Sequence, residues 1–127
     1  MLARGDARAR EAAILRLTSH RADPAVLEQW VTLRRHHPVT ALNALRQLAA
    51  AARFRLPPQR PAVPLLLLSG RQDALVDPRC SADLAARWQL PHIEHPGAGH
   101  DLPLDAGPWL TARIGEWLAG LPDSVPE

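Results

Sequence analysis

The stretch that decides the fold of this chain is Val63–Asp73, which reads VPLLLLSGRQD. Its first six residues, Val63 to Leu68, are apolar without any alternation. Such a run is typical of a strand that is covered on both faces in a parallel sheet. Gly70 lets the chain leave the strand, and Asp73 follows in the next loop. The stretch therefore predicts a buried strand over 63–68 and a loop that carries a carboxylate.

A crossover helix and a second strand follow this loop. Asp77-Pro78 combines a capping residue with a proline, which is typical of a helix start, and the helix is expected to run to about Trp88. His92–His95 reads as a short strand, and Gly97-Ala98-Gly99 must turn sharply after it. Strand, helix and strand in this order predict two parallel strands with a right-handed connection. Gly107-Pro108 is then expected to start a closing helix.

The first 60 residues have a different pattern, that of helices alone. Ala7–Leu17 reads as one helix, Asp23 can cap a second that ends before Pro38, and Thr40 can cap a third. The proline-rich segment Pro57–Pro61 then forms an extended connector. We therefore expect an α/β fold class with three parts, namely a helical region and connector over 1–61, a βαβα unit over 62–121 and a flexible tail over 122–127.

A carboxylate and an imidazole are the chemistry that this order brings together. Asp73 follows the first predicted strand, and His100 follows the second. Because parallel strands point their carboxyl ends toward one edge of the sheet, both loops should open there. A carboxylate that accepts from Nδ1 of His100 would fix the ring in one tautomer and leave Nε2 to take a proton. Gly97 and Gly99 are expected to supply backbone angles that other residues avoid.

These motifs resemble the C-terminal part of the α/β-hydrolase fold superfamily. The matching residues are Gly70-Arg71-Gln72-Asp73 and Gly97-Ala98-Gly99-His100, and the resemblance covers roughly Val63–Leu118. It implies that Asp73 is the acid of a catalytic triad and that His100 is its general base. It also implies hydrolysis of a small-molecule ester or amide, or related acyl chemistry, without a cofactor, and it makes residues 1–60 similar to a helical lid.

The chain departs from that family in one respect, because it contains no Gly-x-Ser-x-Gly nucleophile motif. The family's nucleophile and most of its strands would lie upstream of Met1. Ser69 and Cys80 are the alternative nucleophiles. Ser69, in the loop that also carries Asp73, is better explained as a structural serine, and Cys80 as a buried structural cysteine. We therefore expect a truncated hydrolase that is inactive alone. The alternative is a noncatalytic remnant or interaction fragment, whose exposed sheet edge needs a partner chain.

Other polar residues have simpler interpretations than catalysis. Asp77 is expected to cap a helix, whereas Asp101 and Asp105 should order the loop after the histidine. A metal site is not expected, because His92 and His95 would lie on opposite faces of a strand and no metal-binding spacing accompanies them.

Composition and charge narrow the function classes further. Residues 1–60 hold eleven arginines and four acidic residues, but these arginines are spaced and no aromatic residues alternate with them, so nucleic-acid binding is not expected. The longest apolar run has six residues, far below the roughly 20 that cross a bilayer. The single cysteine, Cys80, rules out an internal disulfide and fits a reducing compartment. The sequence thus predicts a soluble, cytoplasmic protein without a membrane partner.

Overall fold

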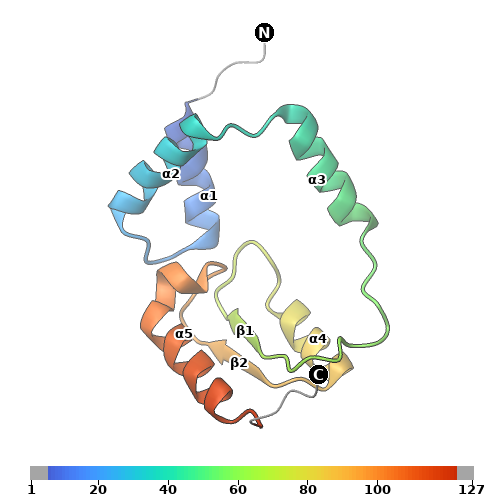
Figure 1. The fold of residues 1–127 in the computed structure, drawn as a ribbon. Coiled ribbons are helices and arrows are strands. Elements are labelled where there is room, and N and C mark those ends of the chain that lie inside the picture. Colours follow the sequence, from blue (N-terminus) through green and yellow to red (C-terminus); the bar gives the residue numbers. More distant parts are fainter. Residues whose placement is uncertain (1–5, 123–127) are drawn as a thin grey trace. The chain divides into compact units, whose positions relative to one another are not determined.

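The structure, a computed structural model, describes residues 6–122. Over these residues the chain forms helices and one two-stranded sheet (Figure 1). In chain order the elements are α1 (Ala7–Thr18), α2 (Pro24–His36), α3 (Ala41–Arg53), β1 (Leu67–Gly70), α4 (Arg79–Trp88), β2 (His92–His95) and α5 (Leu102–Ala119). Apart from Pro122, the tail predicted over 122–127 lies outside the described residues.

The described residues divide into two compact units. One contains residues 6–15 and Asp23–Ala62, and it consists of helices and the connector. The other contains Arg16–Ala22 together with residues 63–122, and it holds the sheet with α4 and α5. The short segment Arg16–Ala22 therefore belongs with residues that begin only at Val63 in the sequence.

The helices of the first unit begin and end where the local signals place them. The Asp23 carboxylate accepts a hydrogen bond from the Ala25 amide at 2.7 Å, at the start of α2. The Thr40 hydroxyl accepts from the Asn43 amide at 3.2 Å, at the start of α3. Helix α2 ends shortly before Pro38, as expected for residues that precede a proline. The predicted caps are thus confirmed.

An ion pair links α1 to α2 within this unit, which also contains one buried apolar side chain. Val31 of α2 is buried, and the nearly buried Glu11 of α1 accepts a hydrogen bond from the Arg34 guanidinium at 2.7 Å. A charge that loses water in this way needs such a partner, because an unpaired buried carboxylate is costly.

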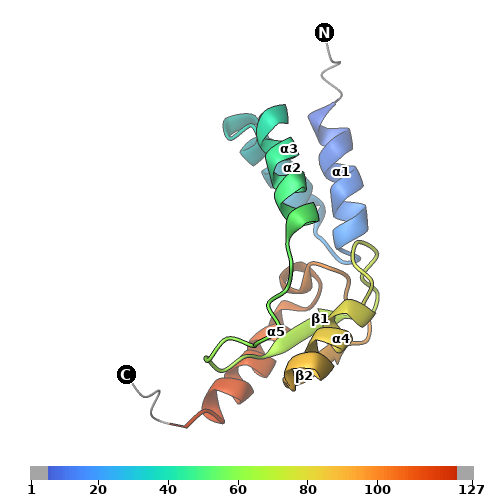
Figure 2. The same ribbon diagram turned by 90° about the vertical axis from the view of Figure 1, so that its right-hand side faces the viewer.

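The sheet of the second unit has the predicted parallel arrangement. β1 pairs with β2 in parallel, and Leu67 lies opposite His92 while Gly70 lies opposite His95. Helices α4 and α5 lie on either side of the strand pair (Figures 1 and 2). The strand–helix–strand unit is therefore confirmed.

The first strand differs from the prediction in its bounds and in its burial. It begins at Leu67 rather than Val63, and it continues through Ser69 to Gly70. Val63 is 57% exposed and Leu65–Leu68 are only partly buried. Helices α4 and α5 both contact β1, but they leave most of its residues partly exposed. The predicted cover on both faces is therefore only partial, and the predicted bounds of the strand are wrong.

The closing helix also starts earlier than predicted. α5 begins at Leu102, and non-helical angles at Ala106 divide it just before Gly107-Pro108. A proline is tolerated in the first turn of a helix, so Pro103 does not prevent the early start. Gly107-Pro108 therefore marks a kink and the second part of the helix instead of its beginning.

A small core lies between this helix and the strands. Its buried residues come from α5 and from the loop between β2 and α5, which carries His100 and which we call the histidine loop; they are Ala98, Leu102 and Ala106. Three partly buried side chains pack against them, namely Leu68, Trp109 and Leu110. The ring of His95 meets that of Trp109 edge to face, with centroids 4.9 Å apart. The core thus holds the first turn of α5 against the ends of both strands, where the candidate site lies.

Candidate active site

Asp73 is held at the carboxyl end of β1 by its own loop. Its Oδ1 accepts hydrogen bonds from the amides of Leu75 at 2.8 Å and Val76 at 2.9 Å. The amide of Gln72, one residue earlier, donates to the Ala98 carbonyl at 3.0 Å. An aspartate that accepts from the amides following it stabilises a turn, so one carboxylate oxygen is used for the turn and the other is free for a further partner.

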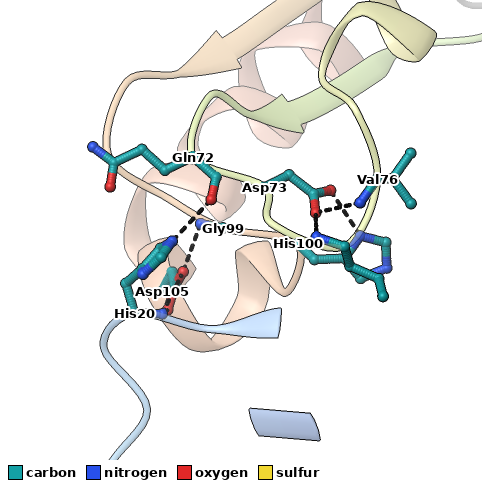
Figure 3. A network of polar contacts seen from close by, with 8 residues as sticks. His20, Gln72, Asp73, Val76, Gly99, His100 and Asp105 are labelled. Atoms are coloured by element: carbon teal, nitrogen blue, oxygen red, sulfur yellow. Dashed lines mark hydrogen bonds and ion pairs between the residues drawn. The ribbon is translucent and has the colours of Figure 1, made fainter. Parts of the chain in front are cut away.

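That further partner is His100, as the sequence predicts. Nδ1 of His100 lies 2.8 Å from Oδ2 of Asp73 (Figure 3). Because a carboxylate can only accept, the ring must carry its proton on Nδ1 in this pair. The carboxylate is mostly buried, with 13% of its side chain exposed, whereas the His100 side chain is 42% exposed. Nε2 of His100 has no hydrogen-bond partner among residues 6–122, so this nitrogen remains available to an incoming group.

The electrostatics of Asp73 favour its charged form. Burial by itself would raise the pKa of Asp73, but hydrogen bonds from the Val76 amide, the His100 ring and the Leu75 amide outweigh it and hold the pKa below its ordinary value. A carboxylate that stays ionised near neutral pH can keep the imidazole in one orientation and stabilise its protonated form.

Gly70 lets the end of β1 approach the histidine loop, and Gly99 lets that loop approach the turn after α1. A Cβ at Gly70 would overlap the backbone of Ala98 and Gly99, and a Cβ at Gly99 would lie 3.1 Å from the Thr18 carbonyl oxygen. Within residues 6–122 no glycine has a positive φ. The sequence prediction that Gly97 and Gly99 supply unusual backbone angles is therefore wrong, because Gly99 and Gly70 are needed for space instead.

A second aspartate, Asp105, joins the histidine loop to the turn after α1. It lies in the first part of α5 and accepts hydrogen bonds from the amides of Gly99 and His20 (Figure 3). It also accepts from the Arg21 amide and from the Ser19 hydroxyl. The predicted role of Asp105 in ordering this loop is in keeping with these contacts. The sequence analysis missed Ser19 and His20, because the end of a helix carries no signal for a partner some eighty residues away.

The other residues weighed from the sequence have structural contacts. Ser69 lies in β1 rather than in the following loop that carries Asp73, which we call the acid loop. Its hydroxyl is hydrogen-bonded to the His92 ring at 2.7 Å. Asp77 accepts from the Arg79 amide at 2.9 Å at the start of α4, as expected for a capping residue. The Arg79 side chain and amide lower the pKa of Asp77 to about 2. Cys80 is instead a free, exposed thiol, so the prediction of a buried structural cysteine is wrong.

Neither a cluster of metal-ligating side chains nor a membrane-spanning helix occurs among the described residues. Between residues 6 and 122, no three His, Cys, Asp or Glu side chains are grouped as a metal ion would require. Within the same range, no helix has both the length and the apolar character that spanning a bilayer demands.

An open apolar groove of about 620 Å³ runs beside the histidine. Side chains of the segment before and within β1 form one wall, and α5 with its preceding loop forms the other. The lining residues are Pro64, Leu65, Leu66, Leu67, Leu68, His100, Leu102, Pro103, Leu110, Ile114 and Trp117. The groove therefore presents an apolar surface with one imidazole at its border.

Comparisons with known proteins address the fold. No protein-family model matches the sequence, and a search of curated proteins gives no match. Among solved structures, a candidate lipase (lip1) from Acinetobacter baumannii AYE matches 86% of this chain with a TM-score of 0.71 and 18% identity. A candidate aryl esterase from Burkholderia cenocepacia matches 88% of the chain with a TM-score of 0.57 and 23% identity. The chain spans 40% and 42% of the length of these two proteins. These likenesses concern the fold alone, and they confirm that the chain has the fold of a part of an α/β hydrolase.

Proposed function

We propose that this chain carries the acid and base of a hydrolase that acts on a small-molecule ester, an amide or a related acyl compound. Asp73 is the acid that orients the ring, and His100 is the general base. The observation that carries the proposal is the 2.8 Å hydrogen bond between Nδ1 of His100 and Oδ2 of Asp73, while Nε2 has no hydrogen-bond partner in the part of the chain that the structure describes.

The proposed chemistry follows from this geometry. Nε2 of His100 takes the proton of an attacking hydroxyl, and the ring becomes an imidazolium whose charge is stabilised by the ionised Asp73. The imidazolium then returns the proton to the leaving alcohol or amine. The exposure of His100 and its place at the border of the apolar groove support a substrate with an apolar part.

The proposal includes a nucleophile that these 127 residues do not supply. They contain no Gly-x-Ser-x-Gly motif, and Ser69 is hydrogen-bonded to His92 instead of to His100. A covalent acyl-enzyme needs an activated nucleophile next to the base. We therefore expect the nucleophile to come from a further segment or from a second chain, and we expect the 127-residue chain alone to be inactive.

The acid–base pair is tested by the tautomer of His100. In a ¹⁵N-labelled chain above the pH at which the ring is protonated, we expect the Nδ1–H form of His100, read from its nitrogen shifts. In Asp73→Asn the amide NH₂ can donate to Nδ1, which favours the Nε2–H form. An Nε2–H form in the unmodified chain would contradict the proposal, since the ring would then offer no base toward the groove.

Inactivity of the isolated chain is tested with short p-nitrophenyl esters. We expect the unmodified chain and His100→Ala to release p-nitrophenol at the same slow rate, because no covalent step is available. Saturable turnover that disappears in His100→Ala would overturn the expected inactivity while supporting the hydrolase chemistry.

The groove supports a second candidate, an interaction fragment that needs a partner chain. β1 has one unpaired edge within the described sheet, and the apolar side chains of the groove are only partly covered. Such surfaces favour association. Light scattering over a concentration series distinguishes this candidate, because a chain that stays monomeric at every concentration does not cover the groove with a second copy. For either function we propose the cytoplasm as the compartment, in keeping with a single free thiol at Cys80.

A further inference from the structure

Asp105 is the most completely hydrogen-bonded carboxylate of the second unit. It is 6% exposed, and its Oδ1 accepts from the Ser19 hydroxyl and from the amides of His20 and Arg21, both at 2.9 Å. Its Oδ2 accepts from the Gly99 amide at 2.7 Å (Figure 3). Four donors therefore surround one buried charge.

These donors indicate that Asp105 acts as an anion. Burial alone would raise the pKa of Asp105, but the hydrogen bonds from Ser19, Gly99, Arg21 and His20 outweigh it and lower the pKa below its ordinary value. Hydrogen bonds to a charged acceptor are stronger than those between neutral groups. All four donors depend on the carboxylate, so they would lose a common partner if it were removed.

The turn held by Asp105 also contacts the two loops of the candidate active site. The His20 ring donates from Nε2 to the Gln72 carbonyl at 2.8 Å, and the Asp101 amide donates to the Thr18 carbonyl at 2.7 Å. Gln72 is the residue immediately before Asp73, whereas Gly99 and Asp101 are the residues on either side of His100. The turn therefore holds the backbone next to both members of the pair (Figure 3).

Gly99 packs closely against the turn and against Asp105. A Cβ at this position would lie 3.1 Å from the His20 ring and 3.2 Å from Oδ2 of Asp105. Little room is left for the histidine loop to move toward the turn. The hydrogen bonds of Asp105 prevent it from moving away, because the Gly99 amide would then lose its partner.

We propose that Asp105, with the turn Thr18–Arg21, is a positioning element that sets the distance between Asp73 and His100. Asp105 is a positioning residue and not a catalytic one, since within residues 6–122 its hydrogen-bond partners are Ser19, His20, Arg21 and Gly99 and include neither Asp73 nor the His100 ring. The inference rests on the proposed function, because the distance between Asp73 and His100 matters for chemistry when the two residues act as an acid and a base. It also means that Ser19 and His20 belong to the support of the site, although the sequence assigned them to a lid-like region.

The test is the tautomer of His100 in Asp105→Asn, in the full ¹⁵N-labelled chain. The amide of asparagine replaces one acceptor by a donor, which then faces the amides of the turn and of Gly99. We expect the Nδ1–H form to give way to a mixture of tautomers, and we expect amide exchange at Gly99 and Asp101 to become faster by on the order of tenfold. Asp101→Asn is the matched control, because the Asp101 side chain adjoins His100 and makes no hydrogen bond within residues 6–122.

The outcomes separate this inference from the proposed function. An unchanged Nδ1–H form in folded Asp105→Asn would overturn the positioning role and leave the proposed function standing. An Nε2–H form in the unmodified chain would overturn the proposed function, and unchanged exchange at Gly99 and Asp101 in Asp105→Asn would then overturn the inference as well.

A second variant keeps the test decisive if Asp105→Asn does not fold. His20→Ala removes the ring's bond to the Gln72 carbonyl and leaves the amide of residue 20 in place for Asp105. We expect a smaller loss of the Nδ1–H form than in Asp105→Asn, because only the contact with the acid loop is lost. If Asp105→Asn did not fold and His20→Ala kept as much of the Nδ1–H form of His100 as the unmodified chain, the inference would be overturned.

Discussion

Two regions of this chain are stabilised in different ways. Around Gly70, Gly99 and Asp105, three segments that are distant in the sequence meet through backbone contacts and a buried charge. In α3 the situation is the reverse, since none of its residues is buried and Leu45 is 63% exposed. The first region depends on tertiary contacts, whereas the helix depends on local signals such as the Thr40 cap. A substitution should therefore cost far more in the first region than on the face of α3.

The largest effect is expected for Gly70→Ala. The new Cβ would overlap backbone atoms of Ala98 and Gly99, and a backbone cannot move aside as a flexible side chain can. We expect a loss of roughly 3 kcal/mol or more in the free energy of unfolding, measured by urea denaturation. Gly97→Ala is the control, because its Cβ would meet only the His95 ring at 4.0 Å. Equal stability of the two variants would show that the loops are not as close as described.

A smaller effect, with a defined pH dependence, is expected for Asp105→Asn. We expect it to cost about 1–3 kcal/mol near neutral pH, because buried donors lose their acceptor. The pKa of Asp105 is lowered in the folded state from an ordinary value of 3.8. Its stabilisation is therefore complete above that pH and is lost as the pH falls through the lower, folded value. Urea denaturation at a series of pH values should show a smaller loss of stability in acid for Asp105→Asn than for the unmodified chain. An equal loss in both would contradict this assignment.

The same contrast explains what could be predicted from the sequence. The caps at Asp23 and Thr40 were predictable because each acts on amides within three residues. The proximity of Asp73 and His100 was predictable because parallel strands place their following loops at one edge of a sheet. The contact between Asp105 and Ser19 was not, since it joins positions 86 residues apart and involves no repeated pattern.

The errors of the sequence analysis have a related physical cause. The apolar run from Val63 to Leu68 indicates what the strand could bury, but burial also requires elements that cover these side chains, and α4 and α5 leave most of β1 partly exposed. The glycines were expected to relax backbone angles, whereas Gly70 and Gly99 make room for other segments of the chain. Both properties depend on what lies opposite a residue, which a local pattern does not contain.

The smallest effect is expected for Leu45→Gln on α3. A leucine that is 63% exposed gains little from burial, so the free energy of unfolding should change by less than about 0.5 kcal/mol. Val31→Ala provides the contrast, because Val31 is only 4% exposed and its loss leaves a cavity worth roughly 2 kcal/mol. Both are measured by urea denaturation at low and high protein concentration. If Leu45→Gln lowered the free energy of unfolding as much as Val31→Ala, and only at high protein concentration, a second copy would cover the exposed face of α3 in solution. The comparison between the two regions would then hold for the isolated chain alone.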